Sequence, residues 1–182
     1  MFRRFRNPAV QPNSLGPLQL QTLNQANQFV ANGQPAQAAP LFEKLAGKME
    51  ATNHPRRAAN LHAQAAHAYA DSQNEQAALD HARAALNLFL QYQMVRRTPI
   101  FYANMTRKLT NKGMKNASEA LAKEFSSRVG PMPEPVTPPA GQRGRLPTNC
   151  SKCGAPIHGD EANWIDASTV ECDYCGSLIR PE

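Results

Sequence analysis

The sequence predicts a mainly α-helical protein with a small β module at its C-terminal end. Three observations support this fold class. Apolar residues recur at helical spacing from about residue 17 to residue 128. Alanine is abundant and aromatic residues make up only 7% of the chain, which favours closely packed helices over a sandwich or barrel. The four cysteines form two C-x-x-C-G motifs near the C-terminus, which indicates a separate metal-held module.

Helix-breaking residues divide the helical region into segments. Pro17 suits a first helical turn, and Asn32-Gly33-Gln34-Pro35 ends one helix and begins another. Further breaks occur around Asn53-His54-Pro55, Asp71-Ser72-Gln73-Asn74, Thr98-Pro99 and Asn111-Lys112-Gly113. We therefore expect six helices, at roughly 17–32, 35–51, 55–71, 74–95, 99–111 and 116–128.

Composition changes along the chain predict its domain organisation. The first residues interleave phenylalanine with arginine, and the stretch after residue 129 is rich in proline, as expected of an extended tether. We expect a disordered basic arm at 1–16, a helical domain at 17–129, a Pro-rich linker at 130–148 and a metal module at 149–182.

The helical region repeats with a period of 40 residues. Its within-pair turns align at Gly33, Gln73 and Gly113, and small and large apolar residues align on either side of them. This series resembles the tetratricopeptide repeat, although that family has a period of about 34 residues. The resemblance implies three helical hairpins stacked as a short tetratricopeptide-like solenoid. An irregular helical bundle is the alternative.

The same resemblance implies a functional surface. In tetratricopeptide proteins the first helices of successive repeats line a concave groove for peptides, where side-chain amides can bond a peptide backbone. The lysines that hold a C-terminal carboxylate in some members are replaced here by Leu23 and Ile100, so no preference for acidic C-termini is implied. An ordinary solvated face is the alternative. The candidate groove residues are Asn24, Asn27, Asn60, Gln64, His67, Asn104, Arg107 and Asn111.

The two cysteine pairs have the spacing of a four-thiolate zinc site, with eighteen residues between the pairs. Their C-x-x-C-G motifs resemble the knuckles of zinc ribbons, which implies a small β zinc ribbon. Four thiolates saturate tetrahedral zinc, so one structural ion with no open catalytic position is expected. Iron in a rubredoxin-like site is the alternative. The expected ligands are Cys150, Cys153, Cys172 and Cys175.

Charge is distributed unevenly. Residues 1–130 contain 16 Lys+Arg and 7 Asp+Glu, for a net charge of +9, whereas residues 150–182 contain 2 and 6, for a net charge of −4. The basic helices could dock an acidic partner, including the chain's own ribbon, or contact the phosphates of RNA or DNA. A solvated basic face is the third possibility. The candidate basic patch comprises Arg96, Arg97, Lys108, Lys112 and Lys115, next to Arg107.

The sequence offers little for catalysis or membrane insertion. The histidines have no neighbouring nucleophile, and the sequence contains neither a Gly-rich phosphate loop nor an apolar run of about 20 residues. No secretory signal is recognisable, so a cytoplasmic protein is expected. We expect a non-enzymatic adaptor that mediates protein–protein interactions through the helical groove and the ribbon. An RNA- or DNA-associated factor and a redox protein with iron are the alternatives.

Overall fold

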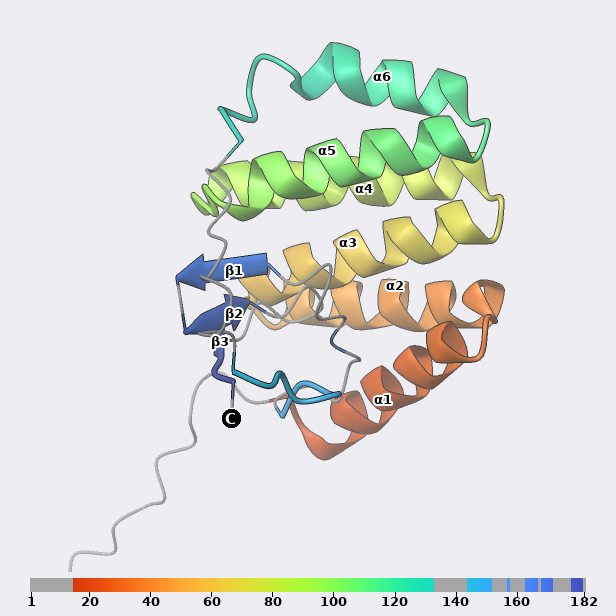
Figure 1. The fold of residues 1–182 in the computed structure, drawn as a ribbon. Helices are drawn as coiled ribbons and strands as arrows, with labels where there is room; N and C mark the ends of the chain where they lie inside the picture. The colour runs from red at the N-terminus through yellow and green to blue at the C-terminus, as the bar shows by residue number, and fades with distance from the viewer. Residues whose placement is uncertain are drawn as a thin grey trace, which may run out of the picture.

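Six α-helices form the main body of the protein in a computed structural model (Figure 1). The structure describes residues 15–132, 144–151, 157, 163–166, 168–171 and 178–181. The mainly helical fold is confirmed. The helices are α1 (Pro17–Ala31), α2 (Pro35–Ala51), α3 (Pro55–Asp71), α4 (Glu75–Gln91), α5 (Arg97–Asn111) and α6 (Lys115–Phe125).

Several helix boundaries differ from the sequence-based expectation. The differences are one residue at the end of α1 and at the starts of α4 and α6, and three residues at the end of α6, which is Phe125 instead of residue 128. Helix α4 ends at Gln91 instead of residue 95, because Gln93 adopts a left-handed conformation with φ of 52° that stops the helix. Helix α5 begins at Arg97 instead of residue 99. Pro99 fits inside its first turn, where a backbone N–H has no helical partner to lose.

The five turns between the helices share one geometry. The left-handed position is taken by residues 33, 53, 73, 93 and 113, which lie 20 residues apart. In every turn the next N–H donates to the carbonyl five residues earlier, as from Gln34 to Phe29 at 2.8 Å, which is the Schellman motif. The 40-residue repeat therefore consists of two equivalent helix–turn units of 20 residues.

Replacing a non-glycine residue in these turns tests this geometry. Gln73 holds a φ of 64°, where a Cβ atom is strained. Gln73→Gly is expected to raise the free energy of unfolding by about 0.5–1 kcal/mol, measured by urea denaturation followed by circular dichroism. The matched exchange Gly113→Gln, at a φ of 80° with open space around it, should lower it. Shifts of the same sign would contradict the shared geometry.

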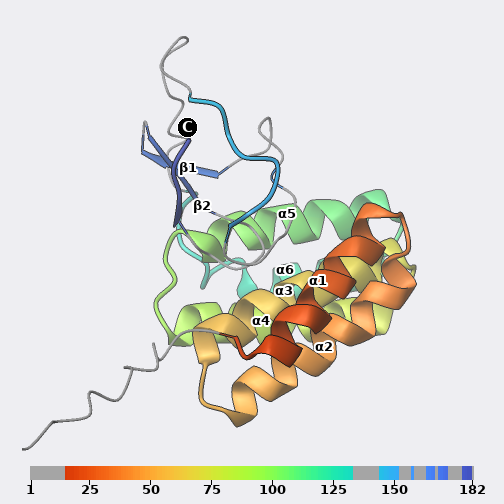
Figure 2. The same cartoon turned by 90° about the horizontal axis from the view of Figure 1, so that it is seen from below.

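The helices alternate between two layers. Each helix packs on the next, and in addition α3 contacts α5 and α4 contacts α6. Figure 2 shows α2 and α4 on one side of the molecule and α5 on the other. Alanines allow α3 and α4 to approach closely, since a methyl group keeps helix axes near each other. The buried alanines of this contact are Ala59, Ala63, Ala66, Ala70, Ala78, Ala82 and Ala85.

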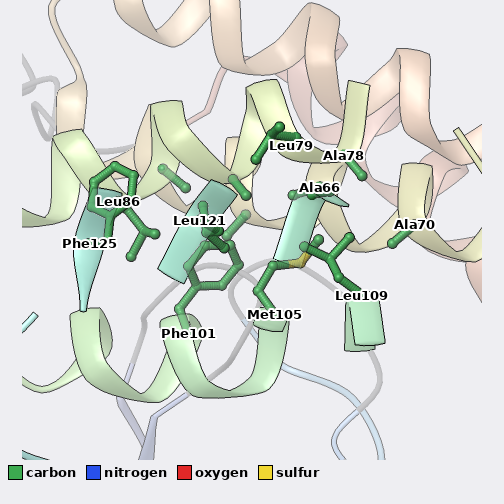
Figure 3. Close-up of a cluster of buried hydrophobic side chains, with 14 of the residues drawn as sticks. Ala66, Ala70, Ala78, Leu79, Leu86, Phe101, Met105, Leu109, Leu121 and Phe125 are labelled. Atoms are coloured by element: carbon green, nitrogen blue, oxygen red, sulfur yellow. The ribbon is translucent and has the colours of Figure 1, made fainter. Parts of the chain in front are cut away.

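Larger side chains fill the core beside α5. Phe101, Met105 and Leu109 lie four residues apart on α5 and point into the cluster that contains Leu121 and Phe125 of α6 (Figure 3). A second cluster joins α1, α2 and α3 around the fully buried Phe42. These clusters fix the position of the α3 and α5 surfaces that face away from the core.

A three-stranded antiparallel sheet follows the helices, with strands β1 (Asn163–Asp166), β2 (Thr169–Glu171) and β3 (Leu178–Ile179) in the order β1-β2-β3. Trp164 pairs with Val170, which pairs with Ile179. In Figure 2 the sheet lies next to α5, on the side opposite α2 and α4. Cys150 and Ile179 belong to the same buried cluster as residues of α1, α2 and α3, so the C-terminal part packs on the helices.

Parts of the expected organisation lie outside the described residues. These parts are most of the basic arm at 1–16, residues 133–143 of the linker, and residues 152–156, 158–162, 167, 172–177 and 182 of the metal module. Within the described part of the chain, no helix combines the length and the apolar character needed to cross a lipid bilayer.

Candidate functional site

A groove of about 970 Å³ lies on the layer formed by α1, α3 and α5. Its floor is the outer face of α3, and one wall is α5. The opposite wall is the end of α1 and the turn into α2, where Val30, Gly33 and Pro35 line it. Because these three helices are alternate members of the stack, the groove is open along one side of the helical layer.

Five of the eight candidate groove residues line this space, namely Gln64, His67, Asn104, Arg107 and Asn111. Their spacing along α3 and α5 places them on the face that turns away from the core. The remaining three do not line it. Asn24 is exposed on α1, while Asn27 and Asn60 are buried within the helical packing.

One end of the groove carries an ion-pair network that the sequence did not indicate. Lys108 Nζ lies 2.6 Å from Asp71 Oδ2, and Lys112 Nζ lies 3.1 Å from Asp71 Oδ1. Burial alone would raise the pKa of Asp71, but the hydrogen bonds and charges of the two lysines outweigh it and lower that pKa. One carboxylate is thus shared by two cations, which leaves this end positively charged.

The other end of the groove meets the sheet. Arg97 Nη1 lies 2.9 Å from Glu171 Oε1 of β2, and both side chains are only 11% exposed. The neighbouring Arg96 donates to the carbonyl oxygen of Trp164 at 3.4 Å. Two residues of the candidate basic patch therefore contact the acidic C-terminal segment of their own chain.

Arg107 lies between these two ends. It is exposed, and its guanidinium donates to Asn104 Oδ1 at 3.1 Å. Among the described residues it has no carboxylate within ion-pair distance. Lys115, the fifth residue of the candidate patch, is exposed at the start of α6 and does not line the groove.

His67 supplies a neutral polar group to the groove floor. Burial, followed by the positive charge of Lys108, lowers the pKa of His67 to about 4, so the imidazole is uncharged at neutral pH. Its ring contacts Phe101 edge-on, at 5.4 Å between centroids. The buried Nδ1 has no hydrogen-bond partner within the described part of the chain.

A second polar cluster lies outside the groove, between α2, α3 and α4. His62 Nδ1 is 2.8 Å from His81 Nδ1, so one ring donates to the other. His62 Nε2 lies 3.3 Å from Glu50, and Tyr69 donates to Glu43. Burial is the largest influence on both imidazoles and lowers the pKa of His62 and of His81. The cluster joins three helices and is sensitive to acid.

The expected metal ligands are only partly described. Cys150 is buried, with 2% of its surface exposed, whereas Cys153, Cys172 and Cys175 lie outside the described residues. Within the described ranges no three or more His, Cys, Asp or Glu residues are grouped as a metal site.

Comparison with known protein families, curated proteins and solved structures finds no match to this chain.

Proposed function

We propose that this protein is a non-enzymatic adaptor that binds a peptide segment of a partner protein in the groove between α1, α3 and α5. The observation that carries the proposal is the groove itself, since about 970 Å³ of space is lined by amide, imidazole and guanidinium groups on a rigid helical face. Asn104 and Asn111 are exposed, and their side-chain amides can donate to and accept from a peptide backbone.

The helical arrangement supports a tetratricopeptide-like solenoid over an irregular bundle. Adjacent helices pack in sequence order, alternate helices form two layers, and the five turns share one geometry. Repetition of one helix–turn unit produces a regular stack, and such stacks present extended concave faces.

We further propose that the C-terminal segment is a zinc ribbon with one structural ion. Ile157 donates its N–H to the Thr148 carbonyl at 2.9 Å, which closes a loop around the first C-x-x-C pair. The pairing of Glu171 with Leu178 closes the connection that contains the second pair. The two C-x-x-C pairs would supply four thiolates, which is a ligand set of structural zinc. Cysteines must be reduced to bind zinc, and this requirement favours a cytoplasmic protein.

Purified protein is expected to contain one zinc ion per chain and to be colourless. Removal of one ligand by Cys150→Ser should lower the zinc content to well below one ion per chain, because three thiolates bind zinc less tightly than four. Elemental analysis and the absorption spectrum measure both properties. A visible thiolate-to-iron absorption band in the parent protein would instead support the rubredoxin-like alternative.

The contacts of the sheet support docking of this acidic segment on the basic helices. The Arg97–Glu171 pair is largely shielded from water, and Ile179 packs with residues of α1, α2 and α3. An ion pair shielded from water is screened less by salt than an exposed pair, and loss of one partner would leave the other charge buried and unpaired. The ribbon is thus proposed to form one end of the partner-binding surface.

A variant that fills the groove tests the adaptor function. Asn104 is exposed inside the groove, so Asn104→Trp adds a large side chain there without disturbing the core. Glu119→Trp, at an exposed position of α6 in the other layer, is the matched control. Partners recovered with the full-length chain from its own cells should be lost with Asn104→Trp and kept with Glu119→Trp. Equal recovery with both variants would refute the proposal.

A further inference from the structure

The groove carries a positive charge that its own carboxylates do not balance. Four cationic side chains line it, and two carboxylates contact them, Asp71 at one end and Glu171 at the other. Among the described residues, two positive charges remain in excess. One is the guanidinium of Arg107, and the other arises because Lys108 and Lys112 share Asp71.

The spacing of these excess charges fits an extended chain. Arg107 of α5 and Lys112, the residue that follows α5, are five positions apart, which corresponds to about 7.5 Å along the helix axis. Alternate side chains of an extended peptide are separated by about 7 Å and point to the same side. Acidic residues at every second position could therefore reach both cationic positions at once.

The uncharged groups of the groove suit a peptide backbone between those acidic side chains. Asn104 and Asn111 are exposed and line the groove, and His67 lines it as an uncharged side chain. The side-chain amides of the two asparagines can donate to and accept from a peptide backbone.

We propose that the groove binds an extended acidic segment of a partner protein, with alternate carboxylates held by Arg107 and by the Lys108–Lys112 pair. This inference rests on the proposed adaptor function and specifies its ligand. The Arg97–Glu171 contact is an example of the same chemistry within the chain, since a carboxylate from an extended strand is held by an arginine of the groove. A guanidinium can hold a carboxylate through two parallel hydrogen bonds.

RNA is a less suitable occupant of this surface. Sequence-tolerant binding of single strands relies on exposed aromatic rings that stack on the bases. The one aromatic side chain that lines the groove, Phe101, is only 7% exposed. The largely exposed hydrophobic residues of the described chain are Leu18, Leu20, Val95, Met132 and Leu178, none of them aromatic.

Two labelled hexapeptides test the proposal on the full-length protein. One alternates glutamate with serine and the other alternates glutamine with serine, so that they differ in charge and little in shape. Fluorescence anisotropy is expected to show that the acidic peptide binds at least about tenfold more tightly, with an affinity that falls as salt is added. An oligouridine of equal charge provides the nucleic-acid comparison.

Two pairs of variants test whether the acidic peptide binds in the groove. Within each pair, the same change in charge is made once in the groove and once outside it. Arg107→Gln should lower the affinity for the acidic peptide at least about tenfold. Lys115→Gln removes an equal charge outside the groove and should change that affinity less than about twofold. Asp71→Asn should strengthen binding several-fold, since it frees Lys108 and Lys112. Asp80→Asn makes the same change in net charge away from the groove and should have little effect.

Three results would overturn the inference. These are equal affinity for both peptides, equal effects of the matched variants, and tighter binding of oligouridine that displaces the acidic peptide. The adaptor function is tested separately, because Asn104→Trp blocks the groove to any peptide. If that variant loses its partners while the glutamate and glutamine peptides bind alike, the function stands and the acidic specificity fails.

Discussion

Phe89→Ala is expected to lower the free energy of unfolding by about 3–5 kcal/mol, the usual cost of removing a buried aromatic side chain. Phe89 is fully buried on α4. Its ring contacts Phe101 of α5 edge-on, at 5.6 Å between centroids, and the guanidinium carbon of Arg97 lies 5.9 Å from the ring centroid. Truncation would therefore leave a cavity where α4 supports the helix that forms one wall of the groove.

Urea denaturation followed by circular dichroism measures this loss. Val95→Ala is the matched control, since Val95 is exposed between α4 and α5 and its truncation should cost less than about 0.5 kcal/mol. A loss below about 1 kcal/mol for Phe89→Ala would contradict the packing described here. Weaker binding of the acidic peptide by folded Phe89→Ala would further connect this core to the position of α5.

Acidification is expected to produce the second large effect. The pKa of His67 is lowered from 6.5 to about 4 in the folded protein, because burial disfavours the charged imidazole. The unfolded chain therefore takes up this proton first as the pH falls. The contribution of His67 to stability is complete above pH 6.5 and is lost progressively toward pH 4, by a total of about 3 kcal/mol.

Other titratable groups also make the folded protein less stable in acid, but over different pH ranges. The pKa values of His62 and His81 are also lowered, so their contributions decrease as the pH falls below 6.5. The pKa of Asp71 is lowered as well, and its ion pairs are lost only below about pH 3.8, the ordinary value of a free aspartate. Acid destabilisation above pH 4.5 should therefore come from the histidines.

The measurement is the free energy of unfolding at a series of pH values between 7 and 4.5. His67→Gln should reduce the slope of stability against pH, because glutamine does not titrate. His54→Gln is the control, since His54 lies in the turn between α2 and α3 and contacts Thr52. An unchanged slope in His67→Gln would show that His67 is not held neutral by burial.

The helix positions could be predicted because proline, glycine and asparagine mark most of the turns. The 20-residue unit was harder to recognise, since its left-handed positions are Gly33, Asn53, Gln73, Gln93 and Gly113, and glutamine is not a characteristic residue for that conformation. For the same reason the sequence predicts the end of α4 at residue 95, four residues after its observed end at Gln91.

The candidate groove residues coincide only partly with the lining of the groove. Gln64, His67, Asn104, Arg107 and Asn111 line it, whereas Asn24, Asn27 and Asn60 do not. The groove is reached only by the C-terminal end of α1, at Val30 and the following turn. The curvature of a stack depends on packing details that a repeat pattern does not contain.

Docking of the acidic C-terminal segment on the basic helices was among the expectations, but the individual ion pairs of the groove could not be predicted, because they join distant parts of the chain. Lys108 and Asp71 are 37 residues apart, and Arg97 and Glu171 are 74 apart. His62 and His81 are 19 residues apart and meet across α3 and α4. Residue spacing within one helix does not indicate such contacts. In the 20-residue unit, however, His62 and His81 occupy nearly equivalent positions of two successive helices.

Site-specific photocrosslinking tests most directly whether the groove is the functional surface. A photoreactive amino acid replaces Asn104 in the groove in one variant and Glu119 on α6 in another. After irradiation in the protein's own cells, we expect a discrete crosslinked product from position 104 that is absent from position 119, and that product should disappear when Arg107→Gln is added. Equal products from both positions, or a product from position 119 alone, would contradict the account.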